Sequence, residues 1–165
     1  GNNKRWADLS SKSREYVESC WNKRRALEKG AYLPYEGKWP WHQIGFDHMS
    51  GRVLRDEEFE YLKSCIDGNA SSEPDILLMD DLLGRGLLVR PGFKFGCKWR
   101  VYDANLEESH APWLIQPVHH ASTTWEGVCL SIRLAEGVHK EWVCAIFSDN
   151  KWNYLRIKRW LPKRN

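Results

Sequence analysis

Residues 81–102 read DLLGRGLLVRPGFKFGCKWRVY, and this stretch decides the fold of the C-terminal half of the chain. The apolar residues 87–89 and the alternating residues 93–103 have the pattern of β-strands. The Pro-Gly step between them predicts a tight turn, and Gly96 permits a close approach of the backbone within a sheet. The stretch therefore predicts two strands joined by a turn.

Further strands are predicted downstream, at residues 113–118, 141–148 and 152–160. Residues 125–136 carry apolar side chains at helical spacing, and a short helix over residues 74–84 leads into the first strand. The C-terminal half is therefore expected to be a mixed sheet with one helix packed against it.

The N-terminal half is predicted to be mainly helical. Residues 7–29 carry apolar positions at roughly helical spacing, with Ser10 or Ser11 as the candidate N-cap. A second helix is expected over residues 56–66. The intervening residues 32–51 are rich in proline, glycine and aromatic rings, which indicates an ordered loop.

A linker is indicated by the composition of residues 68–74, GNASSEP. We therefore expect residues 1–80 to form an N-terminal, mainly helical domain and residues 81–165 to form a C-terminal domain. The predicted fold class is α+β: a helical or small α/β N-terminal region, followed by a C-terminal mixed β-sheet domain with a packed helix.

Charged residues are segregated along the chain, although the net charge is only +3. Residues 56–81 hold nine acids against Lys63 alone, whereas residues 85–100 and 151–164 hold basic residues and no acid. Aromatic rings alternate with these basic residues: Trp99, Trp152, Tyr154 and Trp160. A positive surface with interleaved rings favours a nucleic-acid partner. The alternative is that the basic residues protect ordinary solvated strand edges.

Several classes of protein are not indicated. No run of about 18 apolar residues predicts a membrane span, and no signal peptide is evident, so we expect an intracellular protein without a membrane partner. The five cysteines are widely spaced and include no CxxC pair, so they are expected to be reduced. The sequence predicts no metal and no cofactor. The alternative is a metal site in which one of the cysteines is joined by one of four histidines: His42, His48, His119 or His120.

Three side chains of the C-terminal half have the chemistry to cleave RNA together: Tyr102, His110 and Lys140. Cleavage by the 2′-hydroxyl of the RNA needs a base, an acid and a cation near the phosphate. Histidine titrates near neutral pH and suits the acid, whereas a phenol acts as a base only if a cation lowers its pKa. Each residue also has an ordinary interpretation, as a strand-end ring, a loop histidine and a solvated lysine.

The sequence around these residues resembles the catalytic domain of the tRNA intron endonuclease family. Residues 81–102 resemble the family signature, in which an RGY-type step precedes a Pro-Gly turn, a K-FG segment and a strand ending in VY. His110 and the following APWLI resemble the family's histidine and hydrophobic strand. Residues 132–147, IRLAEGVHKEWVCAIF, resemble its R-LA-SV-K segment and central strand.

The resemblance implies a nuclease that excises introns from precursor tRNA at bulge-helix-bulge sites without metal, leaving a 2′,3′-cyclic phosphate and a 5′-hydroxyl. It makes Tyr102 the general base, His110 the general acid and Lys140 the group that stabilises the transition state. It also implies that RNA bases are gripped by Arg133 and Trp160, with Arg156 or Arg159 as further candidates.

The resemblance leaves the assembly open. It implies a site completed across subunits, so the partners are precursor tRNA and either a second copy or a paralogous subunit. The turn between the last two predicted strands reads SDNK, and Asp149 is its only acid, where relatives use an acidic plug. The compartment is expected to be cytoplasmic if the source is archaeal and nuclear if it is eukaryotic.

Three other functions compete with this interpretation. One is a non-catalytic RNA-binding or scaffold subunit of the same complex. Another is a metal-dependent nuclease that uses Asp103 and Glu141. A third is a protein-interaction domain whose ten tryptophans form an oligomer interface.

Overall fold

The computed structural model describes residues 5–69, 72–103, 112–160 and 162. The chain divides into two compact units, one up to Gly86 and one from Leu87 onward, which are described separately below. The predicted fold class is confirmed, because both units combine helices with a sheet. Among the described residues, no helix has both the length and the apolar character that a membrane span requires.

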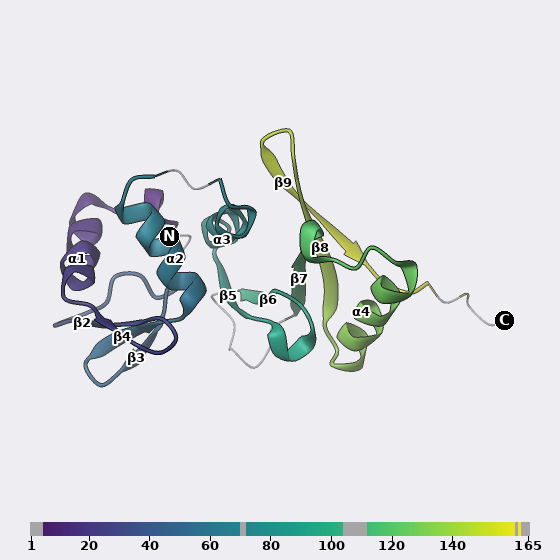
Figure 1. The fold of residues 1–165 in the computed structure, drawn as a ribbon, viewed down its shortest axis with the longest axis horizontal. Coiled ribbons are helices and arrows are strands. Elements are labelled where there is room, and N and C mark those ends of the chain that lie inside the picture. Colours follow the sequence, from purple (N-terminus) through teal and green to yellow (C-terminus); the bar gives the residue numbers. More distant parts are fainter. Residues whose placement is uncertain (1–4, 70–71, 104–111, 161, 163–165) are drawn as a thin grey trace. The chain divides into compact units, whose positions relative to one another are not determined.

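The N-terminal unit contains a four-stranded antiparallel sheet in the order β1-β2-β4-β3 (Figure 1). Its elements in chain order are η1 (Trp6–Asp8), α1 (Ser11–Asn22), β1 (Arg25–Ala26), β2 (Ala31–Pro34), β3 (Phe46–His48), β4 (Gly51–Leu54), α2 (Asp56–Ile66) and α3 (Pro74–Gly84). Besides its helices, the unit therefore contains a sheet that was not predicted from the sequence. The strands are two to four residues long, too short to show a clear alternation in the sequence.

The first helix begins where the sequence predicts and ends earlier. Ser10 is the N-cap of α1, and its side chain accepts a hydrogen bond from the Ser13 amide at 3.1 Å. The helix ends at Asn22 because the following residues turn back as a hairpin. Gly30 in this hairpin has a φ of 96°, and a Cβ there would lie 1.9 Å from the Leu54 carbonyl oxygen. Only glycine fits that position.

The aromatic segment predicted as an ordered loop contains two strands, and the residues between them enter the core. Trp41 and Ile44 are buried, and the buried Arg52 fixes this segment from β4. The guanidinium of Arg52 donates to the Ile44 carbonyl at 2.8 Å, to the His42 carbonyl at 2.8 Å and to the Asp47 carboxylate at 2.9 Å. A buried cation with this many acceptors is fully compensated.

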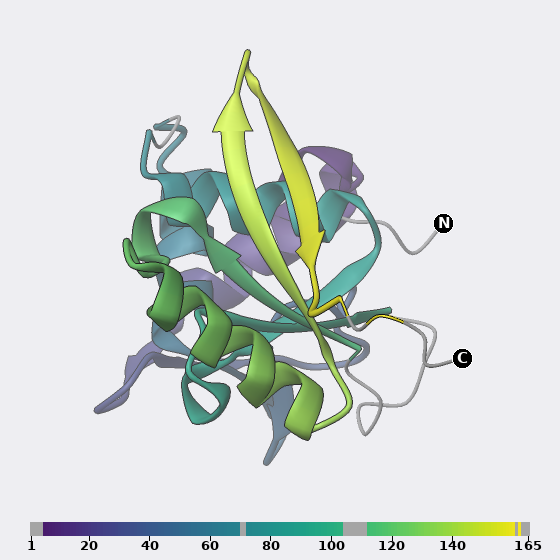
Figure 2. The same cartoon turned by 90° about the vertical axis from the view of Figure 1, so that its right-hand side faces the viewer.

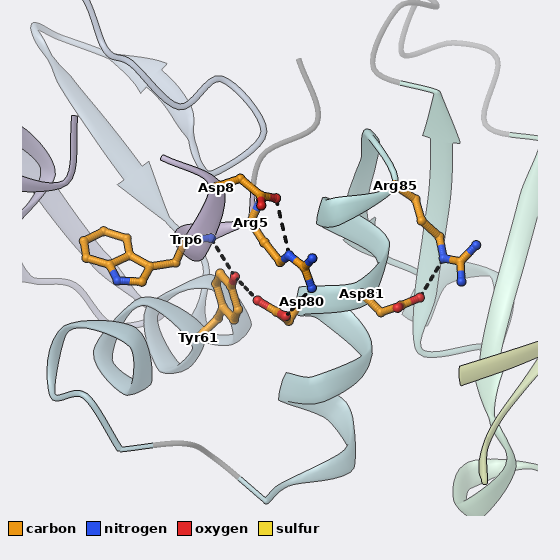
Figure 3. A network of polar contacts seen from close by, with 7 residues as sticks. All are labelled: Arg5, Trp6, Asp8, Tyr61, Asp80, Asp81 and Arg85. Carbon is orange, nitrogen blue, oxygen red and sulfur yellow. Dashed lines mark hydrogen bonds and ion pairs between the residues drawn. The ribbon is translucent and has the colours of Figure 1, made fainter. Parts of the chain in front are cut away.

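A polar network joins η1, α2 and α3 (Figure 3). The Trp6 amide donates to the Tyr61 hydroxyl at 3.2 Å, and that hydroxyl donates to Asp80 at 2.6 Å. Burial raises the pKa of Tyr61, so its hydroxyl stays protonated and remains a donor. Because Asp80 lies in α3, this helix belongs to the N-terminal unit. The units divide after Gly86, whereas the sequence placed the boundary after residue 80.

The C-terminal unit is a five-stranded sheet in the order β5-β6-β7-β8-β9. Its elements are β5 (Leu87–Pro91), η2 (Phe93–Phe95), β6 (Trp99–Asp103), β7 (Trp113–Pro117), η3 (Val118–His120), α4 (Trp125–Gly137), β8 (Glu141–Ser148) and β9 (Lys151–Ile157). β7 and β8 pair in parallel and the other neighbours pair antiparallel. A parallel pair needs a crossover, and α4 provides it. Figure 2 shows β8 and β9 as a long twisted pair with α4 beside them.

Two strand boundaries differ from those predicted. Residues 93–95 form η2 rather than the start of a strand, and Gly96 after it has a φ of 73°. The Pro-Gly turn is tight, since a Cβ on Gly92 would lie 2.5 Å from the Cys97 Sγ atom. At the other end, β9 stops at Ile157, so Trp160 lies beyond the sheet.

The core of this unit lies between α4 and one face of the sheet. Ile132 and Ala135 of α4 pack against Leu114, Trp142 and Cys144. Thr124 caps α4 by accepting a hydrogen bond from the Gly127 amide at 3.1 Å. The helix predicted over residues 125–136 is confirmed, and it fixes the point at which β8 begins.

Candidate active site

Two of the three predicted catalytic residues, Tyr102 and Lys140, lie at one end of the C-terminal sheet. Val101 of β6 pairs with Trp113 of β7, and Trp113 pairs with Glu141 of β8, so these residues form one cross-strand row. The next row at this end contains Tyr102, Pro112 and Lys140, and the Glu141 amide donates to the Pro112 carbonyl at 2.8 Å. β7 lies between β6 and β8. Because neighbouring strands lie about 4.8 Å apart, the Cα atoms of Tyr102 and Lys140 are roughly 10 Å apart.

Tyr102 lies on the same face of the sheet as α4. Its side chain shares a face of β6 with that of Arg100, two residues earlier. Arg100 pairs with Leu114, a residue of the core beneath α4. Tyr102 is fully buried, at 0% exposed, and it clusters with Leu88 across β5 and β6. The side chain is therefore part of the packed core as well as a neighbour of Lys140 along the row.

Lys140 is fixed where α4 passes into β8. His139 takes a left-handed conformation with a φ of 58°, and the Lys140 amide donates back to the Ala135 carbonyl at 2.9 Å. The side chain is half-buried, and its Nζ atom lies 5.6 Å from the centroid of the Phe95 ring. Phe95 comes from the K-FG segment and packs against the core beneath α4. The ring and the backbone bond thus orient the ammonium group.

His110 lies outside the described residues. Along the chain it precedes Pro112 of the Tyr102–Lys140 row by two residues. Its role remains a prediction from the sequence.

The predicted RNA contacts lie on α4, near the end of β9 and on the segment after β9. Arg133 is exposed on α4, and among the described residues its side chain makes no ion pair. Trp160 is 82% exposed. Residues 156–160 line an open hollow of about 540 Å³ with cations and a ring: Arg156, Ile157, Lys158, Arg159 and Trp160. Such a lining suits a nucleic-acid strand.

Two of the basic residues that line this hollow, Arg156 and Arg159, form ion pairs with glutamates. Arg156 pairs with Glu141 at 3.3 Å, and the Nε atom of Arg159 pairs with Glu136 at 2.7 Å. The Arg159 amide also donates to Glu136, at 3.2 Å. Hydrogen bonds from the Arg159 side chain and backbone lower the pKa of the Glu136 carboxyl.

Sequence reasoning missed Glu136. The available signal was an acid in the last turn of a predicted helix, where the helix dipole disfavours negative charge. That signal does not identify the partner. The pairing with Arg159 joins residues 23 positions apart and depends on the path of β9.

The arrangement of the strands does not favour the metal-dependent alternative. Asp103 lies on β6 and Glu141 on β8, and β7 separates these strands. Two carboxylates that share one Mg²⁺ must each bring an oxygen to about 2.1 Å from the ion. The register places Asp103 two residues beyond the Val101–Glu141 row, and Glu141 is paired with Arg156. The five cysteines are free, as expected.

Comparison with known proteins identifies the family of the C-terminal part of the chain. Residues 73–154 match the model of the tRNA intron endonuclease catalytic C-terminal domain. A tRNA-splicing endonuclease of Picrophilus torridus is 30% identical over 116 residues, which are 70% of this chain and 38% of that protein. That of Thermoplasma volcanium is 30% identical over 118 residues, 72% of this chain and 38% of that protein.

A third tRNA-splicing endonuclease, from Methanopyrus kandleri, is 31% identical over 85 residues, which are 51% of this chain and 48% of that protein. The chain thus spans less than half the length of each of these curated relatives. The family match covers α3 and most of the C-terminal unit, from which Tyr102, Lys140 and Arg133 come. The chain belongs to the tRNA intron endonuclease family, through a catalytic C-terminal domain at residues 73–154.

Proposed function

We propose that this chain is a catalytic subunit of a tRNA-splicing endonuclease, which cuts introns out of precursor tRNA. The observation that carries the proposal is the row of Tyr102, Pro112 and Lys140 at one end of the C-terminal sheet. Tyr102 and Lys140, whose side chains suit phosphate chemistry, both lie at this end of the sheet, and His110 precedes Pro112 by two residues along the chain. The family match and the names of the relatives as tRNA-splicing endonucleases support precursor tRNA as the substrate.

The reaction is a transesterification by the RNA itself. Tyr102 takes the proton of the 2′-hydroxyl, and the 2′-oxygen then attacks the adjacent phosphorus while the bond from phosphorus to the 5′-oxygen breaks. His110 protonates the departing 5′-oxygen, and Lys140 stabilises the charge that develops on the phosphoryl oxygens. The products are a 2′,3′-cyclic phosphate and a 5′-hydroxyl, and no metal ion takes part.

The burial of Tyr102 sets a condition on its role. A base must come within about 3 Å of the proton that it removes. The phenol therefore meets an RNA hydroxyl only if its side chain leaves the contact with Leu88 or if the RNA enters the space around it. Lys140, which is half-buried and directly precedes β8, needs no such change.

Substrate is held by the surface on α4 and the C-terminal segment. Arg133 and Trp160 grip an unpaired base of a bulge-helix-bulge RNA by cation and ring stacking, and the neighbouring cations contact phosphates. Arg156 and Arg159 are weaker candidates for direct contact because each is already paired with a glutamate. A second copy or a paralogous subunit completes the substrate site, so the active form is a homo- or hetero-oligomer.

The test is cleavage of a bulge-helix-bulge precursor tRNA in excess EDTA, with the mass of the protein in solution measured alongside. We expect cleavage at both intron boundaries, alone or after addition of a paralogous subunit. RNA binding without cleavage, with and without that subunit, would favour the scaffold alternative. A chemical step that requires Mg²⁺ would favour the metal-dependent alternative.

A further inference from the structure

Glu136, in the last turn of α4, holds the segment that follows β9. One carboxylate oxygen accepts the Arg159 amide at 3.2 Å and the other accepts the Arg159 Nε–H at 2.7 Å. The last strand ends at Ile157, so residues 158–160 have no strand pairing. The paired hydrogen bonds to Glu136 therefore fix the path of this segment beside α4.

The carboxylate occupies a position that helix electrostatics disfavours. The C-terminal end of a helix carries a partial negative charge, which suits a basic side chain, and the last turn of α4 has none. Arg159 supplies the missing positive charge from outside the helix. Glu136 is thus explained by its contact with the C-terminal segment and not by the needs of α4.

The segment that Glu136 fixes presents an aromatic ring. Trp160 directly follows Arg159 and is 82% exposed, in a hollow otherwise lined mainly by cations. Arg133 lies three residues before Glu136 on α4, so its side chain is a neighbour of Glu136 on the helix surface. An exposed ring beside basic side chains is the composition of a stacking platform for an unpaired base.

We propose that Glu136 is a positioning residue, which fixes Arg159 and thereby presents Trp160 as a stacking platform for an unpaired RNA base on the surface of α4 beside Arg133. This inference rests on the proposed function, in which the chain binds RNA and Trp160 stacks on an unpaired base. Glu136 itself does not contact the base. Its effect on RNA passes through the Arg159 contact and the orientation of Trp160.

Whether Glu136→Gln weakens or strengthens RNA binding distinguishes the positioning role from a purely electrostatic effect. Removing an acid from a basic RNA-binding surface should strengthen RNA binding if charge alone matters. If Glu136 positions Trp160, Glu136→Gln should weaken binding instead. We expect the Kd for a fluorescein-labelled bulge-helix-bulge RNA to rise about tenfold, the order expected when one stacked base is lost. The matched control is Glu126→Gln, which removes the same charge from the first turn of α4.

A double-mutant cycle then tests whether Glu136 acts through Trp160. Trp160→Ala should weaken binding as Glu136→Gln does, and the double variant should be no weaker than Trp160→Ala alone. In ¹⁵N-labelled protein, Glu136→Gln should also shift the Arg159 amide resonance and speed its hydrogen exchange, while resonances of β8 stay in place. Tighter or unchanged binding by Glu136→Gln, or effects of the two substitutions that multiply, would overturn the proposal. Failure of the wild-type chain to bind the RNA would instead count against the proposed function.

Discussion

Trp113 and Glu141 are register partners in the parallel pair of the C-terminal sheet. Because β7 and β8 start at the same end of the sheet, Pro112 and Lys140, which directly precede the two strands, lie side by side there. Lys140 precedes Glu141 directly, and His110 precedes Trp113 by three residues. The crossover helix α4 allows β7 and β8 to run parallel and so to begin at the same end of the sheet. In an antiparallel pair the two strands would begin at opposite ends.

The hydroxyl of Tyr102 is expected to matter for catalysis and little for folding. Tyr102→Phe keeps the ring that packs on Leu88 and removes the proposed base. We expect the single-turnover cleavage rate to fall by about 10²–10³-fold, with a circular dichroism spectrum like that of the wild type. Full activity of this variant would make Tyr102 a core residue only.

The role of His110 as the general acid is testable with a modified substrate. His110→Ala should cleave a normal RNA about 10²–10⁴-fold more slowly than the wild type, because the departing 5′-oxygen is no longer protonated. An RNA with sulfur in place of that 5′-oxygen has a leaving group that needs no proton. The variant should cleave this RNA almost as fast as the wild type does. An equal loss on both substrates would contradict the assignment.

The Tyr61 network should contribute to the stability of the N-terminal unit. Tyr61→Phe leaves the Trp6 amide and Asp80 without the hydroxyl that joins them, at a buried position. We expect the free energy of unfolding in urea to fall by about 1–3 kcal/mol. Tyr35→Phe is the control, because it removes an exposed hydrogen bond to Asp47 and should have a smaller effect. Equal losses in the two variants would contradict this account.

The contact between Glu136 and Arg159 should depend on pH. Arg159 lowers the pKa of Glu136 below the ordinary value of 4.5, so the carboxylate is favoured when the C-terminal segment is docked. Its contribution is complete above the pKa of the undocked carboxyl and is lost as the pH falls through the lower pKa of the docked form. The Arg159 amide should therefore become less protected from hydrogen exchange as the solution is acidified below about pH 4. Protection that stays constant while the Glu136 carboxyl is seen by NMR to become protonated would exclude this linkage.

Helices and strands were predictable where the pattern of apolar residues was long or where residues that cap or break an element marked its ends. Residues 56–66 and 74–84 were predicted as helices with the bounds of α2 and α3, and β8 was predicted with its observed bounds. The sheet of the N-terminal unit was not, because pairs such as Tyr32 with Val53 join strands of four residues through long-range contacts. Local periodicity carries no record of such pairing.

The candidate site was predictable in its residue types and only partly in its geometry. Motif order and spacing singled out Tyr102 and Lys140, and the register places both in one row. Neither the burial of Tyr102 nor the contact between Glu136 and Arg159 was visible in the sequence, since both depend on tertiary packing. The pairing of Arg156 with Glu141 was missed for the same reason.

The most direct test of the central claim is single-turnover cleavage of a bulge-helix-bulge precursor tRNA in EDTA by Lys140→Ala, compared with the wild type and with Lys151→Ala. Lys151 is an exposed lysine at the start of β9, so its removal controls for the loss of one positive charge. The account predicts that Lys140→Ala slows cleavage by about 10²–10³-fold at saturating protein, that Lys151→Ala does not, and that the wild-type products end in a 2′,3′-cyclic phosphate. Equal rates for Lys140→Ala and Lys151→Ala would contradict it.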